Sequence, residues 1–97
     1  MKHFIVEITY SVPVEQLSEI LPQHRAFLKI GYERGMLLVS GPQIPRLGGF
    51  VVARAKSVEV LQDFFARDPY NLNHLATYRF VEFDPVLHQP FLSDWLA

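Results

Sequence analysis

His24 is the histidine whose setting in this chain best suits proton transfer. It follows Pro22 in a segment with helical spacing, where it shares a face with Phe27 and Leu28. An imidazole on that face leans toward the core, and it changes its charge near neutral pH, as a general acid or base must. The competing interpretation is a buried structural histidine that is hydrogen-bonded to a backbone carbonyl group.

A histidine that transfers protons needs a partner that fixes its tautomer and its orientation. Asp68 is the candidate carboxylate, because the sequence Asp68-Pro69-Tyr70 holds it at the end of a predicted helix. The competing interpretation is an aspartate that caps a turn ahead of proline. Spacing along the chain leaves open whether Asp68 meets His24.

The Ser40-Gly41 pair follows a predicted strand and is a second candidate for chemistry. Ser40 offers a hydroxyl group, and Gly41, which has no side chain, lets a ligand approach the backbone closely. The competing interpretation is a turn that ends the strand at Pro42. Ser40 is not expected to be a nucleophile, because no Gly-x-Ser-x-Gly elbow surrounds it.

The other three histidines stand in settings that favour structural roles. His3 begins a strand and is expected at an exposed edge, His74 follows a turn, and His88 lies at the polar start of the tail. No histidines or carboxylates share a helical face at ligand spacing, so no metal site is predicted. A glycine-rich phosphate loop is also absent, and no cofactor is expected.

The overall composition limits the classes of protein to which the chain can belong. With 97 residues, 49% of them hydrophobic, we expect one domain over residues 1–97, with a core at 1–84 and a C-terminal tail at 85–97. Nine basic and ten acidic residues give a net charge of -1. That balance does not favour binding to nucleic acid or to an anionic membrane surface.

The chain contains no cysteine, which excludes disulfides, thiolate metal sites and cysteine nucleophiles. Glu7 interrupts the apolar N-terminal run before a signal-like core forms. No apolar run approaches the roughly 20 residues that a membrane span needs. We therefore expect a cytoplasmic protein.

The spacing of apolar residues predicts four strands and two main helices. The predicted strands cover residues 2–10, 36–40, 50–54 and 76–84; a short helix precedes Pro22, a longer one continues to about Arg34, and another follows an N-cap at Ser57. The order β-α-β-β-α-β is that of an α+β, ferredoxin-like sandwich. In it, both helices cover one face of a four-stranded antiparallel sheet.

Three local details complete this prediction. The helix after Ser57 is expected to bury Val60, Leu61, Phe64 and Phe65. Gly48 and Gly49 are expected to form a turn between two strands. A helical turn is expected over residues 72–75.

The sheet face without helices is also partly apolar. Ile5 lies opposite the core-facing stripe of the first strand, and Val81 and Phe83 lie on the corresponding face of the last. An open apolar face favours packing against a second copy of the chain, so we expect a homodimer. The tail, which contains Phe91 and Trp95, is expected to lie across the partner or over the rim of its own sheet.

Several of these features occur together in one order. They are His24 on the first long helix, Gly35 before an apolar strand, the turn Ser40-Gly41-Pro42, the pair Gly48-Gly49, and the turn Asp68-Pro69-Tyr70. Over residues 1–84 this combination resembles the YciI-like (YCII-related) family. The resemblance implies a dimeric α+β barrel built from ferredoxin-like subunits, with a pocket between the helices and the sheet.

The resemblance also implies roles for particular residues. The histidine and aspartate that characterise the family match His24 and Asp68, which makes them our candidate catalytic pair. Ser40, Gly41 and Tyr70 are our candidates for binding a small-molecule substrate. Whether Arg25 adds a contact to a carboxylated substrate or faces solvent stays open.

These residues are most consistent with a cofactor-independent enzyme of the isomerase or lyase type. His24 would take a proton from a small carbon acid, Asp68 would orient the imidazole, and the Gly41 amide or Ser40 hydroxyl would stabilise a developing oxyanion. The same fold also hosts non-enzymes and cofactor-free oxygenases. A non-catalytic, dimeric small-molecule-binding or interaction module is therefore the main alternative, and an oxygenase is a third.

Overall fold

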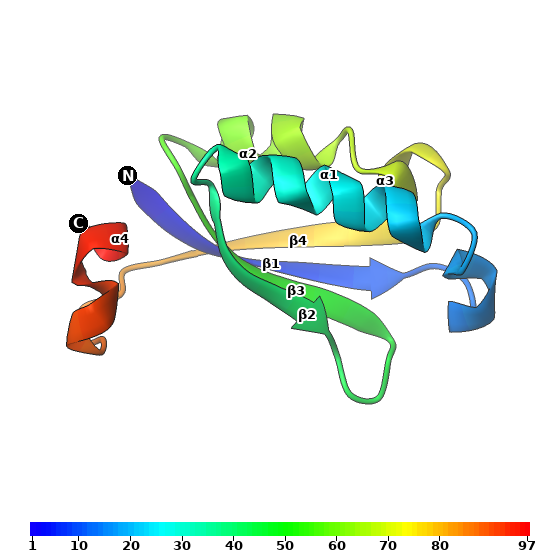
Figure 1. The fold of residues 1–97 in the computed structure, drawn as a ribbon, viewed down its shortest axis with the longest axis horizontal. Coiled ribbons are helices and arrows are strands. Elements are labelled where there is room, and N and C mark those ends of the chain that lie inside the picture. Colours follow the sequence, from blue (N-terminus) through cyan, green and yellow to red (C-terminus); the bar gives the residue numbers. More distant parts are fainter.

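The computed structural model describes residues 1–97, and Figure 1 shows the α-helices that precede the last strand on one side of a sheet. The strands are β1 (Lys2–Tyr10), β2 (Leu37–Pro42), β3 (Gly48–Ala55) and β4 (Ala76–Phe83), and the helices are α1 (Leu21–Glu33), α2 (Val58–Phe65), α3 (Pro69–Leu72) and α4 (Ser93–Leu96). Short 3-10 turns cover Val14–Leu17 and Pro90–Leu92. The sheet order is β2-β3-β1-β4 and all neighbours are antiparallel, which confirms the ferredoxin-like α+β fold.

The core lies between the sheet and the helices. Phe4, Val6 and Ile8 alternate along β1 and are buried on the helix side, as the period of two predicts. Helix α2 begins at the predicted N-cap, since the Ser57 hydroxyl accepts a hydrogen bond from the Val60 amide. Its core residues Leu61, Phe64 and Phe65 pack against the sheet and against Phe27 of α1.

Two local predictions for the helices are wrong. Val60 is exposed, because it lies on the outer face of a helix that packs on the sheet through Leu61 and Phe64. The short helix after Asp68 begins at Pro69 rather than at residue 72, because the Asp68 carboxylate caps its first turn. Helix α1 ends as expected, with Gly35 in the left-handed conformation just beyond it.

The prediction of a turn at Gly48 and Gly49 is wrong, because these two residues are the first residues of β3. A Cβ atom at Gly48 would overlap the carbonyl oxygen of Ile8, so only glycine lets β3 lie this close to β1 at that point. Beside it, the Tyr10 amide donates a hydrogen bond to the Leu47 carbonyl at 3.0 Å. The β2–β3 loop is thereby fixed to the end of β1.

The C-terminal segment folds back on its own sheet, at the end where the chain begins (Figure 1). The Trp95 ring lies 5.6 Å from the ring of His3 and 4.7 Å from the guanidinium carbon of Arg54. Arg54 also donates to the carbonyl oxygens of Gly35 and Trp95, at 2.8 and 2.7 Å. The prediction of an exposed His3 is therefore wrong, since Trp95 covers it.

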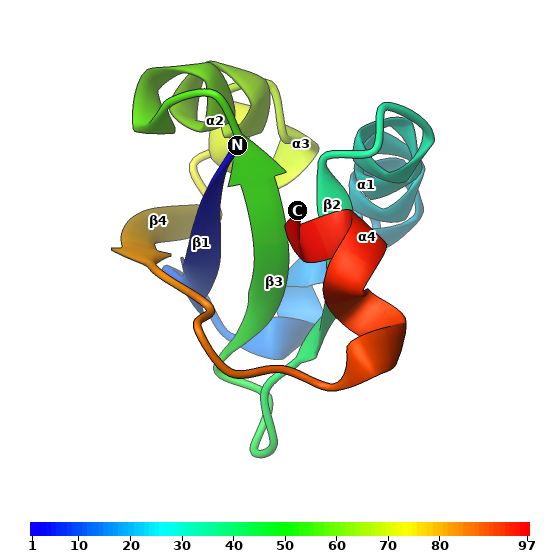
Figure 2. The same ribbon diagram turned by 90° about the vertical axis from the view of Figure 1, so that its left-hand side faces the viewer.

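The face of the sheet away from the helices carries an apolar row that crosses all four strands, and Figure 2 shows these strands next to one another, with β1 and β4 to one side of β3 and β2 to the other. In the strand registers, Val39 pairs with Val52, Val52 with Ile5, and Ile5 with Val81. Val39 and Val81 are exposed. None of the helices is both long and apolar enough to cross a membrane.

The close approach of β3 to β1 generates a stability prediction. Gly48→Ala should lower the free energy of unfolding by about 3 kcal/mol, the upper end of the usual cost of overpacking, because the clash is with rigid backbone. Gly41→Ala is the matched control: its Cβ would meet nothing within 4 Å, so it should stay within about 0.5 kcal/mol of the parent. Urea denaturation measures both, and equal stability of the two variants would contradict the prediction.

Candidate functional site

A pocket of about 260 Å³ opens between α1, the sheet and the β2–β3 loop. Helix α1 contributes one face of it, with residues three and four positions apart. The lining residues are Ile8, Tyr10, Leu21, His24, Arg25, Leu28, Ser40, Gly41, Pro42, Arg46, Gly49, Phe50, Val51 and Tyr70. Four of the five predicted site residues therefore line one pocket. The fifth, Asp68, is not in the pocket wall.

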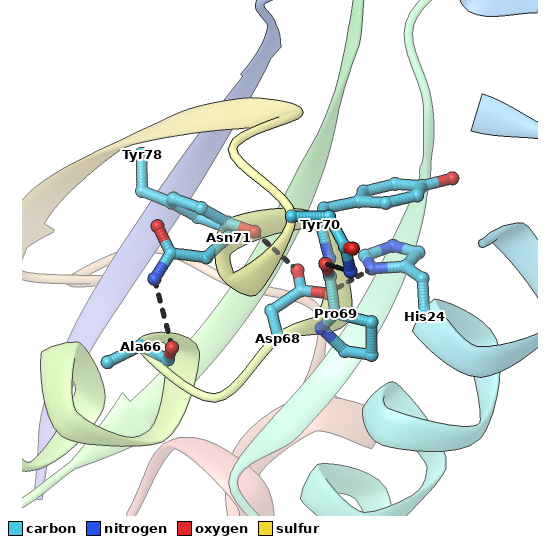
Figure 3. A network of polar contacts seen from close by, with 8 residues as sticks. His24, Ala66, Asp68, Pro69, Tyr70, Asn71 and Tyr78 are labelled. Carbon is cyan, nitrogen blue, oxygen red and sulfur yellow. Dashed lines mark hydrogen bonds and ion pairs between the residues drawn. The ribbon is translucent and has the colours of Figure 1, made fainter. Parts of the chain in front are cut away.

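The structure brings His24 and Asp68 together. His24 Nδ1 lies 2.7 Å from Asp68 Oδ1, although the two residues are 44 positions apart in the chain (Figure 3). The Asp68 side chain is fully buried and that of His24 is 11% exposed. This contact resolves the question that sequence spacing left open.

Asp68 both contacts His24 and caps a turn, so the two interpretations of this residue do not exclude each other. It is the N-cap of α3, where Oδ1 accepts a hydrogen bond from the Tyr70 amide at 3.1 Å. Pro69 follows as the first helical residue, a position where the missing amide hydrogen costs nothing. The capped turn thus fixes the carboxylate that faces His24.

Tyr78 is a member of this network that sequence reasoning missed. Its hydroxyl group donates a hydrogen bond to Asp68 Oδ2 at 2.6 Å (Figure 3). Burial raises the pKa of Tyr78 well above its usual value, and the hydrogen bond to Asp68 raises it further. The alternation along β4 indicates that Tyr78 faces the helices, but not which group on them it meets.

The contacts of Asp68 fix the tautomer of His24. Oδ1 and Oδ2 accept hydrogens from Tyr70 and Tyr78, so the carboxylate acts as an acceptor toward Nδ1 as well. In neutral His24 the hydrogen is then on Nδ1, and Nε2 carries a free lone pair. Nε2 makes no hydrogen bond with the protein, and His24 lines the pocket.

Tyr70 holds the imidazole from one side. Its ring stacks on that of His24, with the ring centres 3.9 Å apart and the planes 9° from parallel. Tyr70 is 1% exposed, and burial raises the pKa of its hydroxyl group above the usual value. The histidine therefore has a fixed ring plane, a fixed tautomer and one nitrogen that makes no hydrogen bond within the protein.

Ser40 and Gly41 lie in the pocket wall, on β2. The Ser40 hydroxyl is 2.7 Å from the hydroxyl of Tyr32 on α1, which ties the helix to the strand. No close contact within the chain requires glycine at position 41, because a Cβ atom there would meet open space. The two residues continue the strand rather than end it, so the interpretation as a terminal turn is wrong.

Arg46 and Tyr10 also line the pocket, and the sequence analysis did not select them. The Arg46 guanidinium lies beside the hydroxyl groups of Tyr10 and Tyr70, and the Tyr10 hydroxyl raises the pKa of Arg46. Arg46 belongs to the loop between β2 and β3, where no periodicity indicates the direction of a side chain. An arginine in a loop next to a glycine pair was the available signal.

The chain contains no group of three or more histidine, aspartate or glutamate side chains placed to hold a metal ion. His24 and Asp68 form the one ion pair within 4.0 Å. The chemistry that this arrangement supports directly is proton transfer at Nε2 of His24, in a pocket with both apolar and polar walls.

The structure places this chain among ferredoxin-like α+β domains, with a pocket between the helices and the sheet. The sequence profile described as the YCII-related domain matches residues 1–84, and the chain belongs to this family. That finding confirms the resemblance noted from the sequence. No match was found among curated proteins.

One similar solved structure is that of 5-chloro-2-hydroxyhydroquinone dehydrochlorinase (TftG) from Burkholderia phenoliruptrix AC1100, in complex with 2,5-dihydroxybenzoquinone. The two structures superpose with a TM-score of 0.67 at 17% sequence identity. The match covers 84% of this chain and 90% of the other. At this identity the likeness establishes a shared fold.

The environment of Tyr78 predicts a specific dependence of stability on pH. In the unfolded chain Tyr78 ionises near its ordinary pKa of 10.0, whereas the raised pKa keeps it protonated in the native state. The unfolded state therefore loses a proton that the native state keeps, and the free energy of unfolding falls as pH rises above about 10. Below that pH the contribution is fully present.

Tyr78→Phe tests this. The variant should be about 1–3 kcal/mol less stable than the parent at neutral pH, because Asp68 Oδ2 loses its donor. Between about pH 9 and pH 11 its stability should fall less steeply than that of the parent. Urea denaturation over this range measures both slopes, and identical slopes would contradict the prediction.

Proposed function

We propose that this protein is a cofactor-independent enzyme that transfers protons on a small carbon acid, as an isomerase or a lyase. The observation that carries the proposal is the contact between His24 Nδ1 and Asp68 Oδ1, which leaves Nε2 free in the wall of a pocket. The dehydrochlorinase named above shares the fold, and the elimination that its name describes supports the lyase alternative.

In the proposed reaction, His24 Nε2 takes a proton from a substrate carbon next to an electron-withdrawing group. The electron pair of the broken C–H bond moves into the adjacent group and forms an enolate. In an isomerisation, the imidazolium returns the proton to a different carbon. In an elimination, chloride leaves with the electrons of its bond to carbon while a double bond forms, and the imidazolium gives its proton to solvent.

The residues around His24 would assist these steps. Asp68 holds the reactive tautomer and stabilises the positive charge of the imidazolium, and Tyr78 and the Tyr70 amide keep that carboxylate in place. Ser40 and the backbone at Gly41 lie in the pocket wall, where they are candidates to hydrogen-bond the enolate oxygen.

Turnover of a panel of lactones and chlorinated cyclic acids tests the proposal, with absorbance and chloride release as the readouts. His24→Gln should lower turnover by about 10²–10⁴-fold, the usual contribution of a general acid or base. The matched control is His88→Gln, because His88 is exposed and lies outside the pocket; it should retain full activity. If the panel shows no activity that His24→Gln removes, the enzymatic proposal fails.

Asp68→Asn separates positioning from folding in the same experiment. In the parent, nitrogen-15 NMR should find neutral His24 protonated on Nδ1; in the variant this preference should be lost and turnover should fall. A folded variant with the parent's tautomer and turnover would count against the pair. Ligand binding that survives both His24→Gln and Asp68→Asn, without turnover in any variant, would favour the binding module.

We also propose that the protein is a homodimer that buries the apolar row on the open face of the sheet. Light scattering at micromolar concentration should give the mass of a dimer, and Val81→Glu should give that of a monomer. Val60→Glu is the matched control: Val60 is 46% exposed on α2, Val81 is 37% exposed on β4, and only Val81 lies on the open face. A monomeric parent would overturn this proposal.

A further inference from the structure

The pocket carries positive charge that the proposed proton transfer does not use. Arg25 and Arg46 both line it, whereas no aspartate or glutamate does. Neither arginine has a carboxylate partner, because the one ion pair in the chain joins His24 and Asp68. The whole chain has a net charge of -1, so this positive charge is a local property of the pocket.

Two polar groups of this pocket are buried without a partner. They are the hydroxyl oxygen of Tyr70 and Nε of Arg46, and neither makes a hydrogen bond within the protein. Figure 3 shows that the Tyr70 hydroxyl points away from Asp68, so it takes no part in the His24–Asp68 network. Buried polar groups are nearly always satisfied, and an unpaired one calls for an explanation.

The fold holds in place the Tyr70 ring and the backbone that carries Arg46. Stacking on His24 fixes the Tyr70 ring. The loop that carries Arg46 is fixed by the hydrogen bond from the Tyr10 amide to the Leu47 carbonyl and by the close approach at Gly48. The Tyr70 hydroxyl and the loop that carries Arg46 are therefore positioned before any ligand binds, which lowers the entropy cost of binding.

We propose that Arg46 and Tyr70 form a subsite for the oxyanion of a small organic acid with a single ring, whose ring lies against the apolar wall beside His24. The inference rests on the proposed function for the role of His24, but the binding that it predicts is independent of turnover. Arg46 supplies a fixed positive charge, and the Tyr70 hydroxyl donates a hydrogen bond to the same anion.

The size and lining of the pocket favour this class of ligand. Its volume of about 260 Å³ is near the lower limit of about 300 Å³ for small-molecule sites, which suits a ligand with one ring. The apolar members of the lining are Ile8, Leu21, Leu28, Pro42, Phe50 and Val51. The oxyanion is a carboxylate or an ionised hydroxyl group on the ring, and both present the same charged oxygen to Arg46.

Arg46 is the better candidate of the two arginines. Arg25 is exposed on α1, where solvent screens its charge, whereas Nε of Arg46 is buried. The raised pKa of Tyr70 supports its role in the subsite, because a hydroxyl that stays protonated acts as a donor toward an anion. An anion held there would also have its charge stabilised as the enolate forms.

NMR titration of the full chain with four probes tests the subsite. Benzoate is compared with neutral benzamide, and 4-nitrophenolate with neutral nitrobenzene. At least one anion should bind about tenfold tighter or more than its neutral counterpart, and Arg46→Met should remove most of that difference. Whichever anion shows the preference identifies the source of the oxyanion.

Two further variants test whether the anion preference depends specifically on Arg46 and Tyr70. Arg67→Met is the matched control, because Arg67 is an exposed arginine outside the pocket; it should bind the anion as the parent does. Tyr70→Phe keeps the ring and removes only the hydroxyl. It should weaken binding of the anion without changing binding of the neutral probe. Tyr70→Phe also tests the subsite if Arg46→Met fails to fold.

Several outcomes would overturn the subsite. They are equal binding of anion and neutral probe, no binding of either anion at high millimolar concentration, equal losses in Arg46→Met and Arg67→Met, or unchanged anion binding in both Arg46→Met and Tyr70→Phe. His24→Gln separates this inference from the proposed function. Anion binding that persists in His24→Gln and is lost in Arg46→Met supports the subsite even if no substrate is turned over, whereas turnover without anion preference supports only the proposed function.

Discussion

The buried carboxylate of Asp68 is the constraint on which the site depends. It has no contact with solvent, and its two oxygens accept hydrogen bonds from an imidazole on α1, a backbone amide on α3 and a phenol on β4. A buried charge is tolerated only when it is paired and fully hydrogen-bonded, and removing one partner from such a pair costs about 3–5 kcal/mol. The three elements must therefore meet in this geometry for the chain to be stable, so the geometry of His24 is a consequence of folding.

How much of this the sequence predicts depends on the range of the interaction. The strand alternation around Phe4 and Val6 and the N-cap at Ser57 are local patterns, and both predicted the structure correctly. His24 and Asp68 were each suspected from their neighbours, but their contact joins residues 44 positions apart and arises only from packing of helices on the sheet. The pattern along one element predicts a face, whereas the partner on that face is set by elements elsewhere in the chain.

The errors have the same origin. His3 lies on a central strand and is covered by Trp95 from the other end of the chain, which no pattern near His3 indicates. Gly48 was assigned to a turn from its residue type, although what requires glycine is the carbonyl of Ile8 on a neighbouring strand. Arg46 was overlooked because a loop has no periodicity from which to infer where its side chain points.

A comparison of two arginines shows how the structure separates stability from function. Arg54 is used within the chain: Nε and Nη1 donate to backbone carbonyls, and the guanidinium lies over the ring of Trp95. These contacts join the C-terminal segment to β3 and to the end of α1, and Arg54 does not line the pocket. Arg46 is carried by a loop whose backbone is fixed to β1, yet its buried Nε has no acceptor and no carboxylate is paired with it. Since the fold maintains this unpaired group at a cost, and places it in the same pocket as the free nitrogen of His24, the missing acceptor belongs to a molecule that this pocket binds.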